Sequence, residues 1–173
     1  PYCDVIDDAA KAIGSVNTIV RGEDGKLTGF NTDAAGLEYT IRRAGITIEN
    51  KKVLILGTGG TSRTAYALSE YLKAREIIKV SRSEKDGAVS YETAYRKHHD
   101  AEIIINTTPS GMYPNSEDSP IMLESFTKLE GVIDAIYNPL RSNLITDALK
   151  RGIKASGGLY MLVAQAVKAS EYF

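Results

Sequence analysis

A glycine-rich turn is the first stretch of this sequence whose residue types and spacing could do chemistry. In "VLILGTGGTSR", Gly57, Gly59 and Gly60 follow an apolar run and precede a helix-forming stretch. A residue without a Cβ lets a phosphate approach the backbone, and the N-terminus of the next helix offers free N–H groups. The pattern G-x-G-x-x-Ser, completed by Ser62, predicts a dinucleotide site, with a plain tight turn as the alternative. No Gly-Lys-Ser/Thr follows, which excludes a Walker loop.

The end of the next apolar run indicates which dinucleotide fits. An NAD site usually has an acidic residue there, which accepts hydrogen bonds from the ribose hydroxyls. This sequence has "KVSRS", with Ser81, Arg82 and Ser83 at that place and no carboxylate. A guanidinium and two hydroxyls suit a ribose 2′-phosphate, so the sequence favours NADP. The same absence argues against S-adenosylmethionine. The alternative for Arg82 is a solvated loop cation.

A hydride transfer to or from an alcohol also needs a group that moves the hydroxyl proton, and the usual groups are missing. The only histidines, His98 and His99, are adjacent at the polar end of a predicted helix, where we expect them to be exposed. No tyrosine is followed four residues later by lysine, which excludes the usual short-chain dehydrogenase pair. With one cysteine and no spaced histidine pair, we expect no metal site.

Two carboxylates and two other polar side chains remain as candidates. Asp33, in "GFNTDAAG", either caps the helix that follows it or forms half of a catalytic pair. Asp134, in "VIDAIYNP", either takes part in catalysis or bonds backbone groups at the end of an apolar strand, where an unpaired charge is costly. Tyr137 could point into a cleft at the carboxyl edge of the sheet. Gln165 either reaches that cleft or is a half-exposed polar residue of the last helix.

Residues 51–173 must form the scaffold that positions these groups. Five apolar runs alternate in this part of the sequence with helix-forming stretches, and a Pro/Ser/Asn-rich loop follows the third run. Such alternation is typical of βαβ units. It predicts a Rossmann-like, doubly wound α/β domain with a parallel sheet covered on both faces. The runs are residues 52–57, 76–83, 101–108, 131–139 and 153–156, and the loop is residues 109–120.

Residues 1–50 have a different pattern. Residues 1–13 resemble the back end of a helix, and the runs 16–21 and 27–31 flank Asp24-Gly25, which predicts a β-hairpin. Residues 34–44 have helical spacing and end at Gly45, a candidate C-cap. A hairpin and a helix are too little to bury a core. We therefore expect a domain boundary near residue 50.

Composition limits the classes of protein and of partner. The chain has 173 residues, of which 43% are hydrophobic and 25% charged, and a net charge of −1. Nothing indicates a nucleic-acid or membrane partner. A single cysteine, Cys3, excludes an intrachain disulfide and fits a reducing compartment. The start of the sequence lacks the features of a secretory signal, so a cytoplasmic protein is the expectation.

The order of motifs resembles the shikimate dehydrogenases over essentially all 173 residues. The matching stretches are "IGSVNTIV", "GFNTDAAG", "VLILGTGGTSR", "VSRS", "INTTPSGM", "DAIYNPLRSNLI" and "GGLYMLVAQA". That family reduces 3-dehydroshikimate to shikimate with NADPH in the pathway to aromatic amino acids. Its active site lies between a substrate domain and an NADP domain. The resemblance implies that residues 1–50 are the tail of the substrate domain with a connecting helix, and that residues 51–173 are the NADP domain.

The resemblance also implies roles for individual residues. Asn17, Asp33, Tyr137 and Gln165 would bind the substrate, and Asp33 would be the carboxylate half of a Lys–Asp catalytic pair. The cofactor residues would hold the pyrophosphate, the 2′-phosphate and the nicotinamide side in turn. They are Gly57, Thr58, Gly59, Gly60 and Thr61, then Ser81, Arg82 and Ser83, then Thr107, Thr108, Ala135, Gly158 and Met161.

The sequence departs from the family pattern in several places. Ser81-Arg82-Ser83 stands where the family usually has Asn-Arg-Thr or Asn-Arg-Ser, and "NTTPSGM" replaces the commoner "NATxxGM". The family's lysine motif, N-V-T-x-P-x-K, and its S-x-S substrate clamp are both missing. We therefore expect a portion of a shikimate dehydrogenase that lacks most of the substrate domain and is inactive alone.

Other interpretations of function and assembly stay open. A quinate/shikimate relative that uses NAD is one alternative, because substrate choice would be read in the missing serine clamp. A stand-alone NADP-binding sensor module is another. For assembly, the hypothesis is a homodimer through the hairpin at residues 15–32.

Overall fold

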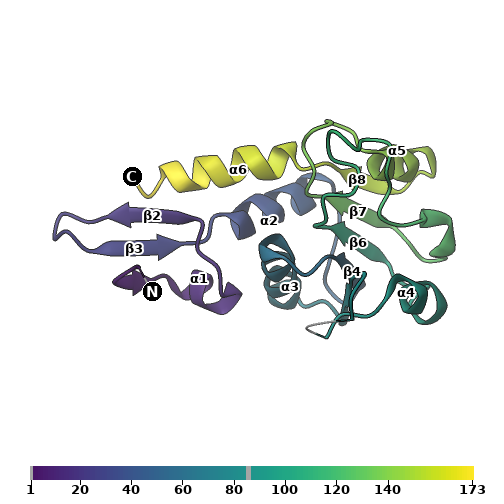
Figure 1. Ribbon diagram of the computed structural model, residues 1–173, viewed down its shortest axis with the longest axis horizontal. Helices are drawn as coiled ribbons and strands as arrows, with labels where there is room; N and C mark the ends of the chain where they lie inside the picture. Colours follow the sequence, from purple (N-terminus) through teal and green to yellow (C-terminus); the bar gives the residue numbers. More distant parts are fainter. Residues whose placement is uncertain (1, 85–86) are drawn as a thin grey trace.

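The computed structural model describes residues 2–84 and 87–173, and its strands form two separate sheets (Figure 1). The larger sheet is five-stranded and entirely parallel, in the order β5-β4-β6-β7-β8. The smaller sheet has three strands in the order β1-β3-β2. The strands are β1 (Val5–Ile6), β2 (Thr18–Arg21), β3 (Leu27–Phe30), β4 (Lys52–Leu56), β5 (Glu76–Val80), β6 (Ile103–Asn106), β7 (Gly131–Asp134) and β8 (Lys154–Ser156).

Helices cover both faces of the parallel sheet. The helices α4 and α5, with the short 3-10 helix η1, pack on one face, and α2, α3 and α6 pack on the other. This arrangement confirms the predicted doubly wound α/β fold. The helices are α1 (Asp8–Ile13), α2 (Asp33–Arg43), α3 (Gly60–Tyr71), α4 (Tyr91–Lys97), η1 (Leu123–Ser125), α5 (Asn143–Lys150) and α6 (Leu159–Ser170).

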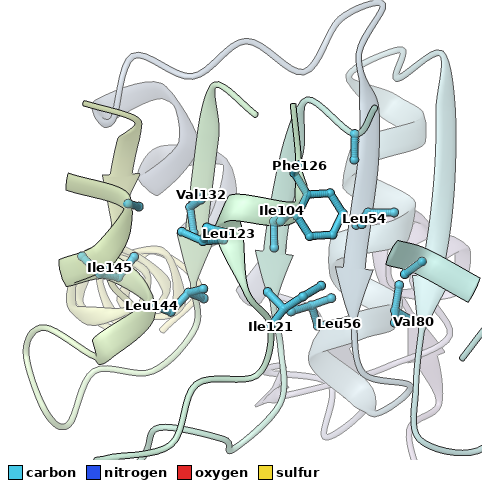
Figure 2. Close-up of a cluster of buried hydrophobic side chains, with 13 residues drawn as sticks. Leu54, Leu56, Val80, Ile104, Ile121, Leu123, Phe126, Val132, Leu144 and Ile145 are labelled. Carbon is cyan, nitrogen blue, oxygen red and sulfur yellow. The ribbon is translucent and has the colours of Figure 1, made fainter. Parts of the chain in front are cut away.

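Alternate residues of the central strands enter two different hydrophobic clusters. Leu54 and Ile104 belong to the cluster drawn in Figure 2, which also holds Phe126 from the segment after η1. Their neighbours Val53 and Ile103 belong to the cluster on the opposite face. Because both faces of these strands are buried, the sequence reads there as continuous apolar runs rather than alternating ones.

The small sheet confirms the predicted hairpin and corrects the expectation for residues 1–13. Strands β2 and β3 pair antiparallel, from Thr18 opposite Phe30 to Arg21 opposite Leu27. Residues 5 and 6 are not helical, because they form β1 and pair in parallel with β3. The helix begins only after Asp7, whose carboxylate accepts a hydrogen bond from the N–H of Ala9 at 3.0 Å. Val5 of β1 pairs with Thr28 of β3, more than 20 residues later, so the local sequence pattern does not indicate this strand.

Helices α2 and α6 lie side by side and run between the two sheets (Figure 1). Leu37 and Ile41 of α2 pack into a cluster of the parallel sheet. Beyond the end of α6, Tyr172 stacks on Phe30 of β3, with ring centroids 4.0 Å apart. Residues before and after position 50 therefore pack together in two places, against the parallel sheet and against β3. The boundary near residue 50 stays a prediction.

None of the helices in the described parts of the chain is long and apolar enough to span a membrane.

Candidate functional site

A groove of about 750 Å³ lies at the carboxyl ends of β4, β5 and β6. The chain goes from β4 to β5 on one side and then crosses to β6 on the other, so β4 and β6 flank a reversal of strand order. Ligands of open α/β sheets bind at this kind of switch point. Many of the predicted cofactor residues line the groove: Gly57, Thr58, Gly59, Ser81, Arg82, Thr107 and Thr108.

Gly57 is required by the backbone and by its surroundings. Its φ of +109° lies in a region that side chains disfavour, and a Cβ there would be 2.7 Å from Oγ1 of Thr107. Ser62 in the first turns of α3 donates a hydrogen bond to the carbonyl oxygen of Gly57 at 2.7 Å. The turn that leaves β4 is thus held against both β6 and α3.

The other two glycines of the motif face open space. A Cβ on Gly59 or Gly60 would have no atom within 4 Å. This space adjoins the N-terminus of the 12-residue helix α3, where unpaired N–H groups favour an anion. Arg82 and Tyr91 both line the groove. Burial raises the pKa of the Tyr91 phenol, and the nearby positive charge of Arg82 opposes this rise. The groove therefore combines open space at a helix N-terminus with a cation, an arrangement that can accept a phosphorylated dinucleotide.

A second cluster forms around Thr32, which is completely buried. Its N–H donates to Oδ1 of Asn17 at 2.9 Å. Its hydroxyl lies 3.2 Å from Oε1 of Gln165 and 3.3 Å from Oδ1 of Asn17. The structure therefore brings together Asn17 near β2, Gln165 of α6 and, next to Thr32 in the chain, Asp33. Three of the four predicted substrate residues meet at one point, although 148 positions separate Asn17 from Gln165.

Asp33 is the first residue of α2 and does not cap it. The N-cap residue is Thr32, which makes no side-chain cap bond, whereas Oδ1 of Asn31 accepts a hydrogen bond from the N–H of Ala34 at 3.3 Å. Burial raises the pKa of Asp33 above its usual value, and a hydrogen bond from Asn17 partly opposes this shift. No ion pair within residues 2–84 and 87–173 involves Asp33. Its carboxylate is therefore half-buried, and among the described residues no cation is paired with it.

Comparison with known proteins gives these two clusters a context. No protein-family model matches the chain. A shikimate dehydrogenase (NADP(+)) from Clostridium perfringens is 38% identical over 177 residues, which cover 97% of this chain and 65% of that protein. The structure of a chorismate mutase/shikimate 5-dehydrogenase fusion protein from Clostridium acetobutylicum matches 99% of this chain and 65% of that one, with a TM-score of 0.92 and 32% identity. This chain is a homologue of the shikimate dehydrogenases.

The chain spans about 65% of the length of the shikimate dehydrogenases that it matches. Two solved relatives differ in their dinucleotide. The shikimate 5-dehydrogenase of Thermus thermophilus, in complex with NADP(H) and shikimate, matches 98% of this chain and 66% of its own, with a TM-score of 0.82 and 29% identity. That of Listeria monocytogenes, in complex with shikimate and NAD, matches 99% and 67%, with a TM-score of 0.83 and 26% identity. Similarity to these relatives therefore does not by itself indicate which dinucleotide this chain binds.

Some residues predicted from the shikimate dehydrogenase motifs lie outside the lining of the groove. Ser83 is exposed beyond the tip of β5, and Tyr137 is half exposed after β7. Gly158 approaches the carbonyl of Ala135 so closely that no Cβ would fit between them, while Met161 is buried in a hydrophobic cluster. Gly60 and Thr61 form the first turn of α3, beside the groove.

Two further expectations from the sequence are decided by burial. Asp134 has no exposed surface, and its carboxylate bonds the N–H of Ile136 and the side chains of Asn106 and Ser142, which agrees with the structural alternative. His99 is exposed as expected, whereas the expectation for His98 is wrong because it is half-buried. Burial and the nearby Lys52 lower the pKa of His98. Lys52 begins β4, so this histidine lies at the opposite edge of the sheet from the groove.

Sequence reasoning missed several residues that the structure places in the two clusters. Thr32 was a candidate helix cap and was not predicted as a site residue, although a threonine in an Asn-Thr-Asp run is a natural hydrogen-bonding group. The loop after β6 was matched to the shikimate dehydrogenase pattern only in its first residues, within "INTTPSGM", yet the loop forms one wall of the groove. Its length of 12 residues was the available signal, because such loops are usually functional. The missed groove residues are Tyr91, Pro109, Ser110, Met112, Tyr113, Pro114, Asn115, Asp118, Ser119 and Pro120. The described residues contain no cluster of three or more metal-ligating side chains.

Proposed function

We propose that this chain is the NADP-binding portion of a shikimate dehydrogenase and also carries part of its substrate site. The observation that carries the proposal is the convergence of Asn17, Asp33 and Gln165 around Thr32. A cofactor sensor would not need these groups, whereas a polyhydroxylated acid needs closely spaced acceptors and donors for its hydroxyls. The homology to shikimate dehydrogenases supports the same substrate class.

In this proposal the groove binds the dinucleotide. The turn at Gly57 and the N-terminus of α3 hold the pyrophosphate, and Ser81 with Arg82 binds the 2′-phosphate of NADP. When bound, NADPH supplies the hydride that reduces the carbonyl of 3-dehydroshikimate. Thr107 and Thr108 line the groove at the end of β6 and orient the cofactor.

The substrate residues have separate tasks. The carboxylate of Asp33 accepts hydrogen bonds from substrate hydroxyls, and Asn17 and Gln165 supply amide groups on either side of it. Tyr137 contacts the substrate from the end of β7. The hydroxyl proton at the reacting carbon must be moved by a lysine paired with Asp33, which would tune that lysine by its charge.

No lysine of the described structure fills that role. Lys11 is paired with Asp8 at 3.1 Å and Lys26 with Asp24 at 3.0 Å, and no lysine contributes to the pKa of Asp33. We therefore propose that this chain alone binds NADP but does not oxidise shikimate.

Two measurements on the purified chain test this function. Calorimetric titration with NADP⁺ and with NAD⁺ should give binding with a preference for NADP⁺. A spectrophotometric assay of shikimate-dependent NADPH formation should show none, with a full-length shikimate dehydrogenase as positive control. No dinucleotide binding would contradict the proposal, and robust turnover would contradict the need for an external lysine. A preference for NAD⁺, with quinate as the better ligand, would instead support the quinate/shikimate relative.

A further inference from the structure

A carboxylate with no exposed surface, that of Asp134, lies at the end of β7 beside the groove. No ion pair within the described ranges neutralises it. Burial raises the pKa of this carboxyl above its usual value, and hydrogen bonds oppose that shift. A buried charge without a cation is costly, so the groups that surround it have to be well placed.

Three hydrogen-bond donors from three segments meet at Asp134. Oδ1 accepts from Nδ2 of Asn106 at 2.9 Å and from the N–H of Ile136 at 3.1 Å. Oδ2 accepts from the hydroxyl of Ser142, which is the N-cap residue of α5. Asn106 is the last residue of β6, so this carboxylate joins the ends of two neighbouring strands to a helix start.

The other end of the Asn106 side chain holds the wall of the groove. Its Oδ1 accepts hydrogen bonds from the N–H of Thr108 at 3.0 Å and from the hydroxyl of Thr108 at 2.7 Å. Thr107 donates its own hydroxyl to the carbonyl oxygen of Leu56, the residue before Gly57. The turn after β6 is therefore fixed from both sides, by β4 and by Asn106.

A carboxamide has a donor end and an acceptor end, and its function here depends on which way it faces. Oδ1 of Asp134 receives two N–H groups, so it acts as an acceptor in either protonation state of the carboxyl. It therefore holds the NH₂ group of Asn106 toward itself, and the carbonyl end of Asn106 must face Thr108. If that amide turned over, its NH₂ group would meet the N–H of Thr108, and the hydrogen bond there would be lost.

We propose that Asp134 is a positioning residue of the cofactor groove, which acts by fixing the amide orientation of Asn106 and thereby the backbone at Thr108. It touches no ligand itself. For its effect on the cofactor, the proposal rests on the proposed function, because Thr108 is expected to contact NADP. Its structural part stands on the hydrogen bonds alone.

The test compares two variants of the same hydrogen-bond cluster. Asp134→Ala removes Oδ1, the acceptor that holds the NH₂ group of Asn106, and so frees that amide to turn. Ser142→Ala removes the bond to Oδ2 and the cap of α5, but leaves Asn106 and Thr108 untouched. We expect both substitutions to lower the melting temperature, so thermal unfolding shows whether the two variants are destabilised to a similar extent. Only the first should disturb the groove.

Two readouts are measured on the full chain: amide hydrogen exchange at Thr108 by NMR, and NADP⁺ affinity by calorimetry. For Asp134→Ala we expect protection of the Thr108 amide and NADP⁺ affinity each to fall about tenfold, the effect of one lost hydrogen bond. For Ser142→Ala we expect both to stay within about twofold of the wild type. Equal effects in the two variants, or an unchanged Thr108 amide in folded Asp134→Ala, would overturn the proposal.

A third variant keeps the test decisive if Asp134→Ala does not fold. Asn106→Ser retains Asp134 with its bonds to Ser142 and Ile136, and should reproduce the loss of protection at Thr108. Retained protection there would also overturn the proposal. If the wild-type chain itself fails to bind NADP⁺, the proposed function fails, while the exchange measurements still decide the role of Asp134.

Discussion

Gly36 of α2 faces the main-chain carbonyl of Met161 in α6 across a gap that has no room for a side chain. A Cβ at Gly36 would lie 2.5 Å from that oxygen and 3.1 Å from Cβ of Gln165. The two helices therefore meet backbone to backbone. This close approach places Asp33, three residues before Gly36, near Gln165, four residues after Met161.

Replacing Gly36 with alanine should push α2 and α6 apart. Alanine favours a helix by about 1 kcal/mol, but overpacking against a carbonyl costs about 1–3 kcal/mol, so we expect net destabilisation. Thermal unfolding measures it, with Ala166→Gly, at an exposed position inside α6, as a control for helix propensity alone. A melting temperature equal to or above that of the wild type would show that the contact is not tight.

Replacing Gly60 with alanine should separate cofactor binding from stability. The added methyl group would meet nothing within 4 Å, so the melting temperature should not fall. It would, however, stand where a phosphate approaches the start of α3, and we expect at least about tenfold weaker NADP⁺ binding, or about 1.4 kcal/mol. Calorimetry and thermal unfolding of the same sample decide this. Unchanged affinity would place the pyrophosphate elsewhere.

Arg82→Gln should reduce the preference for NADP⁺ over NAD⁺. The guanidinium lies on the groove wall at the tip of β5, where a 2′-phosphate would gain a charge-assisted hydrogen bond of about 1.5–3 kcal/mol. NADP⁺ affinity should fall about tenfold or more, and NAD⁺ affinity should hardly change. Arg96→Gln on α4, which removes the same charge outside the groove lining, is the matched control. Equal losses for both dinucleotides would argue against a 2′-phosphate site.

Asp33→Asn should stabilise the chain, increasingly so as the pH rises. Burial raises the pKa of Asp33 in the folded state, so the folded protein keeps its proton to a higher pH than the unfolded chain does. Through that interval the unfolded state binds fewer protons, and the free energy of unfolding falls as pH rises. Removing the charge abolishes this loss, and we expect a melting temperature up to about 3 °C higher at about pH 7 and a smaller difference near pH 4.

Asp8→Asn is the control for this pH dependence. Asp8 is also the first residue of a helix, but its side chain is 99% exposed and pairs with Lys11. Folding removes little water from this carboxylate, so its desolvation costs little free energy. The substitution should therefore leave the melting temperature unchanged or slightly lower at about pH 7. If Asp33→Asn behaved in the same way, the burial of Asp33 would not carry an energetic cost.

Thr32→Val should destabilise the cluster that joins the small sheet to α6. Valine keeps the shape but removes the hydroxyl between Asn17 and Gln165, which should cost about 1–3 kcal/mol in unfolding experiments. Thr32→Ser keeps the hydroxyl and should cost less. Thr40→Val is the matched control, because within the described residues the hydroxyl of buried Thr40 bonds only the carbonyl of Gly36, one helical turn earlier. Similar losses in the free energy of unfolding at positions 32 and 40 would show that the Thr32 hydroxyl contributes no more than an ordinary helix hydroxyl.

Much of the fold follows from local sequence. The apolar runs of β4 and β6 are continuous because both faces of each strand are buried, and that pattern is visible without a structure. Gly57 is recognisable because its turn needs a positive φ, which few other residues adopt. Strand β1 was not recognisable, since two residues become a strand only when β3 offers its edge.

The sequence by itself determined the parallel α/β architecture, the glycine turn and the absence of an acid at the tip of β5, because each depends on residues close together in the chain. Only the tertiary structure decided how Asp33, Thr32 and Gln165 meet and why Asp134 is buried. Those relationships depend on the backbone contact between Gly36 and Met161 and on the hydrogen bonds of Asn106. They join segments distant in the chain, and a carboxylate's role depends on what surrounds it in space.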